Sequence, residues 1–281
     1  KIIGAKDLDI KESNNDNNVF SEKLFKDIEG LNPKLQRSLL NNGYEKLTKV
    51  QEMSIPSLLS KTDAIVKSET GSGKTLAYML PILANLMKTE PAINRKDKTL
   101  VLIICPVREL CLQILEICQK VGNACVNIVP GALFGGQDIK SEKEKIRKGL
   151  NIIVGTPGRI LYHLDSTECF TLNNLRHVVF EECDRILDMG FKKELTNILE
   201  HKKFNIELAQ KIFVSACLNN EIKELIGSVQ RSKQPVQIGF EENCINNDFP
   251  DHLTHRYLIC EENKKISVLF SLLKLLEQKK I

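Results

Sequence analysis

The sequence predicts an α/β fold in which helices cover both faces of a parallel β-sheet. Short runs rich in Ile, Val and Phe recur along the chain, and the segments between them are long enough to form helices. The runs are apolar throughout, which is typical of parallel strands buried on both faces. The predicted strands are Ala64–Val66, Leu100–Cys105, Val126–Val129, Ile152–Val154, Val178–Phe180 and Ile212–Val214.

The composition is that of an ordinary globular protein. Hydrophobic residues make up 42% of the 281 residues and charged residues 27%, while aromatic residues are scarce at 5%. The net charge of +4 permits a nucleic-acid partner but is too small to predict one. No apolar run approaches the ~20 residues of a membrane-spanning helix, so we expect no membrane partner. Function must therefore be inferred from motifs.

Three regions are predicted along the chain. Residues 1–22 are rich in Asn, Lys and Asp, which is typical of a poorly ordered extension. Residues 23–240 carry the alternation of strands and helices and form the predicted main domain. Residues 241–281 begin with a polar stretch, followed by a strand-like segment (255–260) and an apolar helix (Ile266–Leu276), which predicts a linker and the start of a truncated second domain. Because the chain starts at Lys1, we expect a fragment of a longer protein.

The nine cysteines and five histidines do not predict a metal site. No CxxC pair occurs, and the histidines lack the spacing of metal ligands. Thiols in a reducing compartment are the simpler interpretation. Cys111 and Cys118 are seven positions apart on a predicted helix, which places both on a core-facing side.

The segment Ser68–Thr75, SETGSGKT, has the pattern of a phosphate loop between a strand and a helix. Glycines let successive backbone N–H groups face an anion, and the helix N-terminus adds partial positive charge. The strict motif has Gly where Ser68 stands, and a simple helix-capping turn is the alternative. Lys74 would contact the β- and γ-phosphates and the Thr75 hydroxyl would bind Mg²⁺. The candidate nucleotide-binding residues of this loop are Thr70, Gly71, Ser72, Gly73, Lys74 and Thr75.

The helix that follows the loop is predicted from apolar residues at helical spacing, with a kink at Pro81. A second predicted helix, around residues 141–149, is dense in Lys and Glu. Ser141 with Glu144 fits a capping box and Gly149 fits a C-cap. Mixed charges of this kind usually mean a solvated face. The apolar positions of the first helix are Leu76, Met79, Leu80, Leu83 and Met87.

A possible adenine-binding element precedes the loop in GYEKLTKVQ, residues 43–51. The amide of Gln51 presents a donor and an acceptor together, which suits the N6/N7 edge of adenine. Taken alone, Gln51 is as well explained as a polar helix residue.

Seven motifs follow one another along the chain: GYEKLTKVQ, SETGSGKT, PVREL (106–110), GG (135–136), TPGR (156–159), EECDRILDMGF (181–191) and SAC (215–217). In this order they resemble the DEAD-box RNA helicase family, and the resemblance covers residues 25–281. The resemblance implies a RecA-like P-loop domain with ATP and Mg²⁺ as cofactors and RNA as partner. Two further stretches, IVPGALFGGQDIKSEKEKIRKG and ILYHLDST, resemble nucleolar helicases of large-ribosomal-subunit assembly, which implies pre-ribosomal particles and a nuclear or nucleolar location.

The resemblance assigns binding roles by position. Tyr44 would stack on adenine, with Phe25 near it, while Thr48 and Gln51 hydrogen-bond the nucleotide. A second set would line a track for the RNA sugar-phosphate backbone, from loops that follow strands at the edge where parallel sheets bind ligands. For Arg159 alone, a surface ion pair is the ordinary explanation. The residues of this set are Pro106, Arg108, Gly135, Gly136, Thr156, Gly158 and Arg159.

The family's Asp-Glu-Ala-Asp motif is Glu181-Glu182-Cys183-Asp184 in this chain. By resemblance, position 181 holds Mg²⁺ through water and Glu182 positions the attacking water. Glu181 keeps the charge but adds a methylene, and Mg²⁺ tolerates such displacement poorly because it demands octahedral geometry. A shift of about an ångström can cost on the order of 10²-fold in rate. Glu181, Glu182 and Asp184 are the candidate catalytic residues.

The family's Ser-Ala-Thr motif is Ser215-Ala216-Cys217, and Val107 replaces the Thr of PTREL. In the family this segment couples hydrolysis to strand separation, a role that falls here to Ser215 and Ala216. A thiol is a much weaker donor than the threonine hydroxyl that would bond Asp184. The altered residues cluster in catalytic and coupling motifs, which predicts weakened hydrolysis with retained ATP binding.

Two functions follow from these observations. The first is an ATP-dependent RNA-binding or remodelling protein with weakened hydrolysis. The second is a catalytically inactive, helicase-like scaffold that docks onto a ribosome precursor. In either case we expect little turnover from these 281 residues alone, because the family's second domain supplies arginines to the γ-phosphate. A P-loop kinase or GTPase is disfavoured, since no acceptor-substrate motif is present.

Overall fold

The computed structural model describes residues 19–68, 71–230, 234–239 and 259–276. The chain divides into two compact units, one comprising Asn17–Cys244 and the other Lys1–Asp16 with Ile245–Ile281. In the second unit the described residues form a 3₁₀ turn, η4 (Glu262–Lys264), and the helix α10 (Lys265–Leu276). The helix predicted over Ile266–Leu276 is therefore confirmed. The strand-like segment 255–260 lies mostly outside the described residues.

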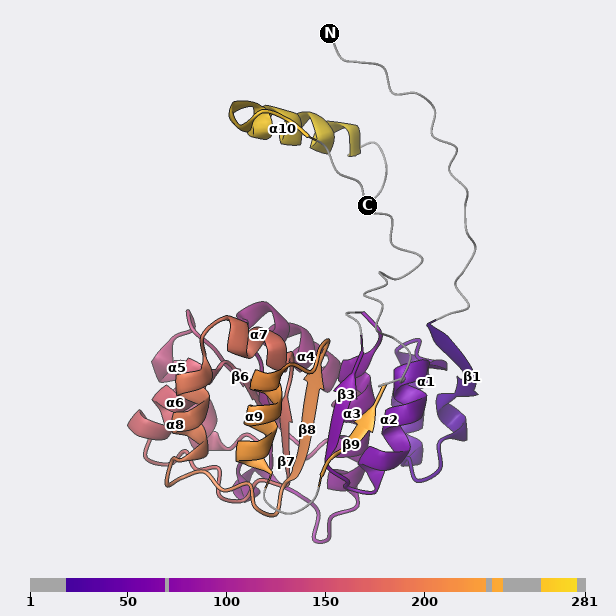
Figure 1. The fold of residues 1–281 in the computed structure, drawn as a ribbon. Helices are drawn as coiled ribbons and strands as arrows, with labels where there is room; N and C mark the ends of the chain where they lie inside the picture. Colours follow the sequence, from indigo (N-terminus) through magenta and orange to yellow (C-terminus); the bar gives the residue numbers. More distant parts are fainter. Residues whose placement is uncertain (1–18, 69–70, 231–233, 240–258, 277–281) are drawn as a thin grey trace. The chain divides into compact units, whose positions relative to one another are not determined.

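The larger unit is built on a seven-stranded sheet in the order β5-β6-β4-β7-β8-β3-β9. Figure 1 labels β6, β7, β8, β3 and β9 of this sheet. Every neighbouring pair is parallel. The predicted parallel sheet is confirmed, because each strand is hydrogen-bonded only to strands of the same direction. The strands are β3 (Ala64–Lys67), β4 (Val101–Ile104), β5 (Pro130–Leu133), β6 (Ile152–Gly155), β7 (His177–Phe180), β8 (Gln210–Ser215) and β9 (Val236–Ile238).

Helices cover both faces of the sheet, as predicted. Alternate strand residues belong to different cores: Val101 and Ile103 of β4 pack in one core, Leu102 and Ile104 in the other. The first core includes α1 (Pro33–Asn41), α2 (Lys49–Leu59), α3 (Lys74–Met87) and α4 (Arg108–Gly122). The second includes α5 (Ile139–Lys148), α6 (Pro157–Ser166), α7 (Cys183–Asp188), α8 (Lys192–Leu199) and α9 (Asn220–Val229).

The prediction of a strand at Val126–Val129 is wrong. The chain forms turns there, in which the Cys125 N–H donates to Gly122 O and the Ile128 N–H to Cys125 O. Val126 is 89% exposed, and the sheet strand begins only at Pro130. A short β-branched run is therefore not sufficient for a strand when local turn bonds take its amide groups.

Several short elements of the structure were not predicted from the sequence. Phe20–Leu24 (β1) and Lys46–Thr48 (β2) form a separate two-stranded antiparallel sheet. Two 3₁₀ turns, η2 (Phe25–Asp27) and η3 (Arg95–Asp97), were not predicted either. Strands and turns of three to five residues are too short to show a hydrophobic period.

The helix α3 is almost entirely buried and runs without interruption through Pro81. Four of its five predicted apolar positions are confirmed as core, since Leu76, Met79, Leu80 and Leu83 are at most 5% exposed. The fifth, Met87, is partly buried and packs against the same core. Cys111 and Cys118 likewise lie buried on α4. Among the described residues, no helix is both long and apolar enough to span a membrane.

His177, at the start of β7, makes stability depend on pH. Gln210 Nε2 donates to Leu58 O and Thr62 O, so its Oε1 accepts from His177 Nδ1–H at 2.8 Å. Burial lowers the pKa of His177 to about 4. Below pH 6.5 the His177 imidazole binds a proton in the unfolded protein but stays neutral in the folded protein. The stabilisation present above pH 6.5 is therefore lost as the pH falls towards 4.

When the pH is lowered from 7 to 5, the free energy of unfolding of the parent protein should fall by about 2 kcal/mol more than that of the His177→Asn variant. Asparagine keeps an amide donor for Gln210 but does not titrate. Urea unfolding at both pH values measures the difference. Parallel losses in the two proteins would show that His177 does not carry this pH dependence.

Candidate nucleotide and nucleic-acid site

The motif of residues 68–75 follows β3, which ends at Lys67, and runs into α3, which begins at Lys74; a phosphate loop requires this context. Gly71 and Gly73 have φ of +80° and +87°, a region that disfavours residues with a Cβ. A Cβ on Gly73 would also collide with the Gln51 side chain. Ser68 Oγ donates to Ser72 Oγ at 2.6 Å. The candidate residue Thr70 lies outside the described residues.

Lys74 is the first residue of α3, and its Nζ donates to Ser68 O across the loop at 2.7 Å. It lines a hollow of about 310 Å³, called here the Lys74 hollow. Four candidate residues from other motifs line it too: Glu182, Asp184, Ser215 and Ala216. The segments that form it follow the neighbouring strands β7, β8 and β3, whose carboxyl ends meet at one edge of the sheet. The full lining is Lys74, Glu182, Asp184, Arg185, Val214, Ser215 and Ala216.

The candidate adenine-binding element is tied to the phosphate loop. Thr48 caps α2, and Gln51 Oε1 accepts from the Thr48 N–H at 2.9 Å. Gln51 Nε2 donates to Gly73 O at 3.1 Å, and the residue is only 3% exposed. Tyr44 is partly buried against the core, in which Phe25 is buried. The bond between Gln51 and Gly73 was not predicted, because nothing in the sequence pairs these positions.

Glu181 follows β7 and is buried, with an exposed fraction of 3%. Burial raises the pKa of this carboxyl to about 7; the Tyr78 hydroxyl and the Lys74 ammonium oppose that rise, while Glu182 and Asp184 reinforce it. Neither Glu181 Oε2 nor the Tyr78 hydroxyl has a hydrogen bond of good geometry. Tyr78 was not predicted as a site residue, because among the apolar residues of α3 it is indistinguishable from a core residue.

Glu182 has a left-handed backbone with φ +51° at the start of α7. Such a conformation costs of order 1–3 kcal/mol in a residue with a side chain and is concentrated at functional sites. Its Oε2 forms an ion pair with the Arg185 guanidinium at 3.1 Å. The backbone therefore holds the Glu182 carboxylate at the rim of the Lys74 hollow.

Asp184 links this motif to the segment after β8. Its Oδ2 accepts from the Ala216 N–H at 3.3 Å and lies 3.9 Å from Cys217 Sγ. Its Oδ1 is buried without a partner. The contact predicted between these two motifs is thus present, but its side-chain half is a long thiol contact where a hydroxyl would bind more strongly.

The second set of candidate residues gathers on the other half of the same edge. Their loops follow β5, β6 and β4, which are neighbours in the sheet. Gly135 and Gly136 are exposed after β5, and the Arg108 guanidinium lies over the Phe134 ring at 5.4 Å. Thr156 is at the N-cap position of α6, where its side chain makes no capping hydrogen bond, and Gly158 and Arg159 lie in the first turn. Pro106 is buried after β4.

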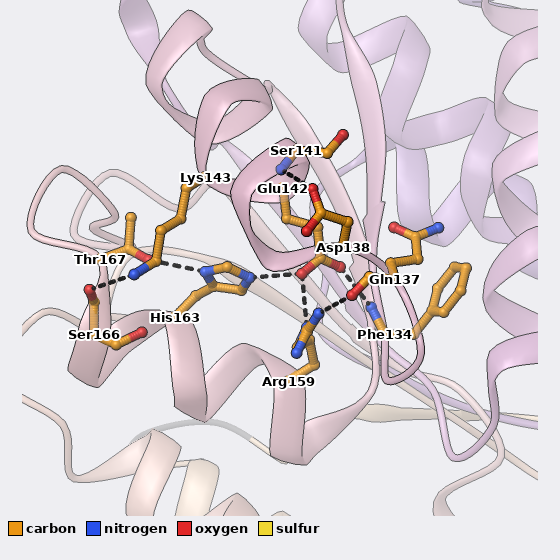
Figure 2. A network of polar contacts seen from close by, with 10 residues as sticks. All are labelled: Phe134, Gln137, Asp138, Ser141, Glu142, Lys143, Arg159, His163, Ser166 and Thr167. Carbon is orange, nitrogen blue, oxygen red and sulfur yellow. Dashed lines mark hydrogen bonds and ion pairs between the residues drawn. The ribbon is translucent and has the colours of Figure 1, made fainter.

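Arg159 does not extend freely into solvent, as Figure 2 shows. Its Nε donates to Glu142 Oε2 and its second guanidinium nitrogen to Gln137 O, both at 2.6 Å. Glu142 is completely buried, and its Oε2 also lies 2.9 Å from His163 Nε2. The arginine is therefore held in one position by the protein itself.

The prediction that α5 has a solvated face applies to only part of the helix, because Glu142 points into the network of Figure 2. The predicted cap is also wrong. Asp138 caps the helix by accepting from the Ser141 N–H at 2.9 Å, so α5 begins at Ile139. Gly149 is confirmed as the C-cap, with φ +97°. The hydrophobic periodicity of α5 could not have predicted that Glu142 binds Arg159 and His163, because these residues lie on another helix, α6.

The strand–loop–helix geometry, with Lys74 sharing a hollow with carboxylates that follow β7, defines a P-loop nucleotide-binding α/β domain of RecA-like architecture. Residues 48–225 match the DEAD/DEAH box helicase family. The chain belongs to this family.

Relatives support the same assignment. The chain is 36% identical over 261 residues to DEAD-box ATP-dependent RNA helicase 17 of Oryza sativa, covering 88% of this chain and 43% of the relative. It is 43% identical over 209 residues to ATP-dependent DNA helicase DDX31 of Homo sapiens, covering 74% and 24%. ATP-dependent RNA helicase DBP7 of Candida glabrata is 34% identical over 253 residues, covering 84% and 35%. The chain thus spans less than half the length of each of these relatives.

Proposed function

We propose that this chain is the ATP-binding half of an RNA-remodelling ATPase whose hydrolysis is weakened. The observation that carries the proposal is the Lys74 hollow, where Lys74, Glu182 and Ser215 meet from three separate motifs. In this arrangement Lys74 binds the β- and γ-phosphates, Glu182 positions the attacking water, and Ser215 with Ala216 senses the state of the site. Tyr44, Thr48 and Gln51 hold the adenine end.

The residues around Glu181 fit a magnesium ion. A buried carboxylate oxygen on Glu181 and another on Asp184 have no partner, and Thr75 places a hydroxyl at the start of α3. Mg²⁺ prefers such oxygen ligands and usually keeps several waters, so one or two protein groups suffice beside the nucleotide phosphates. When bound, Mg²⁺ would neutralise phosphate charge. Thr75 would bind it directly and Glu181 through water.

Arg108 and Arg159, with the backbone of Gly135, Gly136 and Thr156, would hold the RNA sugar-phosphate backbone. Contacts of this kind position a strand without reading its sequence. The names of the Oryza and Candida relatives describe RNA helicases, which favours RNA as the partner. By the narrower sequence resemblance, the RNA belongs to pre-ribosomal particles, and the protein acts in the nucleus or nucleolus.

Two departures from the family motif support weakened hydrolysis. Glu181 carries its carboxylate one methylene beyond the family's Asp, and octahedral Mg²⁺ tolerates that displacement poorly. Cys217 replaces a hydroxyl with a thiol 3.9 Å from Asp184, which weakens the link between two motifs at the site. The phosphate loop, by contrast, retains Gly71, Gly73 and Lys74.

RNA-stimulated ATP hydrolysis by the complete protein tests the proposal, with Lys74→Ala as the control. We expect slow turnover that requires RNA and falls by about 10²-fold or more in the variant, because the phosphates lose their cationic partner. The assay compares initial rates with and without single-stranded RNA. Turnover equal to that of the variant would overturn the enzymatic proposal and leave a helicase-like assembly scaffold as the better explanation.

A further inference from the structure

We propose that Glu142 is the positioning residue of the RNA-binding edge, fixing Arg159 and the loop of residues 134–137 in a single arrangement. This inference rests on the proposed function, in which Arg159 and the glycines of that loop contact RNA. Glu142 itself touches no ligand, because it is completely buried. It acts through the groups that it holds.

Both carboxylate oxygens of Glu142 accept hydrogen bonds from different parts of the chain (Figure 2). Oε1 accepts from the backbone N–H of Phe134, at the entry to the 134–137 loop, at 3.3 Å. Oε2 accepts from Arg159 Nε at 2.6 Å and from His163 Nε2 at 2.9 Å. One side chain on α5 therefore joins the loop after β5 to the first and second turns of α6.

His163 completes the network from its far side. Its Nδ1 lies 2.9 Å from Thr167 Oγ1, and the ring is completely buried. Burial lowers the pKa of His163, against the effect of Glu142, which raises it. The neutral ring that results carries its proton on Nε2, donates to Glu142 and accepts from Thr167. The carboxylate thus has two N–H donors on the same oxygen, and only one of them is charged.

Arg159 is restrained on three sides. Besides the Glu142 carboxylate, Gln137 O accepts from its second guanidinium nitrogen at 2.6 Å, and the Tyr162 ring lies 5.5 Å from its central carbon. Its side chain is 13% exposed, so one edge remains accessible. Restraint of this kind before binding reduces the side-chain entropy lost when a ligand is bound.

The energetics favour a positioning role over simple stabilisation. A buried ion pair adds little to stability compared with apolar residues of the same volume, because its desolvation offsets the attraction. What the pair does provide is geometry: Arg159 and Gln137 stay in contact because Glu142 holds Arg159 Nε and the Phe134 N–H together. Glu142 accordingly sets the spacing between two motifs that contact the same RNA strand in the proposed function.

Glu142→Gln is the test variant, with Glu144→Gln as its matched control on the same helix. Glutamine keeps the size of the side chain but has one oxygen, so its NH₂ group must face at least one of the N–H donors around position 142. Glu144 is exposed, so the Glu144→Gln substitution changes the net charge by the same amount but does not alter the network around Glu142. Both variants are made in the complete protein.

We expect Glu142→Gln to raise the RNA concentration for half-maximal ATP turnover by about tenfold, with the KM for ATP changed less than twofold and Glu144→Gln behaving as the parent. Direct binding of a labelled uridine oligomer should weaken by the same factor. Amide hydrogen exchange should quicken at residues 134–137, where the Phe134 N–H loses its acceptor. In an Arg159→Lys background the RNA penalty of Glu142→Gln should largely vanish, because the two residues act as a unit.

If the parent protein binds RNA and the Glu142→Gln variant binds it as tightly as the Glu144→Gln variant does, the positioning role of Glu142 is overturned. The proposed function is then unaffected. Equal penalties of Glu142→Gln with and without Arg159→Lys would overturn the positioning role too, since Glu142 would not act through Arg159. A parent protein that binds no RNA overturns the proposed function itself.

Should the Glu142→Gln variant fail to fold, the variants His163→Gln and His163→Leu replace it. Glutamine places a donor where Nε2 lies and should keep RNA affinity, whereas leucine should lose it, and equal affinities would contradict the proposal.

Discussion

Glu182→Gln should stop ATP hydrolysis by the complete protein while leaving ATP binding intact. The Glu182 carboxylate lines the Lys74 hollow, held there by the left-handed backbone at φ +51°. Glutamine has the same size but cannot accept a proton from the attacking water. Positioned general bases contribute typically about 10²–10⁴-fold to rate, so we expect a loss in kcat within that range. Single-turnover hydrolysis and binding of a fluorescent ATP analogue measure the two effects separately.

The ion pair of Glu182 provides the control. Arg185→Gln breaks the same contact, which is 3.1 Å long, but leaves the carboxylate in place. Since Arg185 is largely exposed, the pair itself contributes little. We therefore expect a change in kcat of less than about threefold, well below the effect of a lost general base. A loss in Arg185→Gln as large as that in Glu182→Gln would mean that the ion pair, and not the carboxylate as a base, matters.

Glu181→Asp should accelerate hydrolysis, by up to about 10²-fold if displacement of the carboxylate is what limits the native site. Glu181 carries a buried oxygen without a partner, and aspartate withdraws that oxygen by one methylene towards the backbone. A better-placed carboxylate would hold the waters of a bound Mg²⁺ with less distortion, because the ion demands near-ideal geometry. The kcat should rise, and the Mg²⁺ concentration for half-maximal turnover should fall.

Glu181→Gln serves as the opposite change, because it keeps the length and removes the charge. It should slow turnover and raise the Mg²⁺ requirement. Aspartate and glutamine variants that both behave like the parent would show that position 181 does not hold the metal. In that case the interpretation as a helicase-like scaffold would be favoured, because the family's Asp at position 181 would not have increased the rate of ATP hydrolysis.

Much of the fold was predictable because the strands β3, β4, β6, β7 and β8 each contain an apolar run that is visible in the sequence. Runs such as Ile152–Val154 are apolar at every position, and that pattern requires burial on both faces. The exception was Val126–Val129, where turn hydrogen bonds outweighed β-branched composition. The short strands β1, β2 and β9 contain too few residues to show any period, so only packing against neighbours could reveal them.

The sequence by itself determined the order of the motifs and the residue types in them, because the proposed phosphate site needs Gly71, Gly73 and Lys74 within a few positions of one another. Tertiary structure alone decided which side chains meet. The sheet order placed the motifs after β7, β8 and β3 on one half of an edge and those after β5, β6 and β4 on the other. It also brought Glu142 to Arg159 and His163, and Gln51 to Gly73. Periodicity tells which face of an element is buried, but a hydrogen bond between two elements depends on strand order and register, which no local pattern encodes.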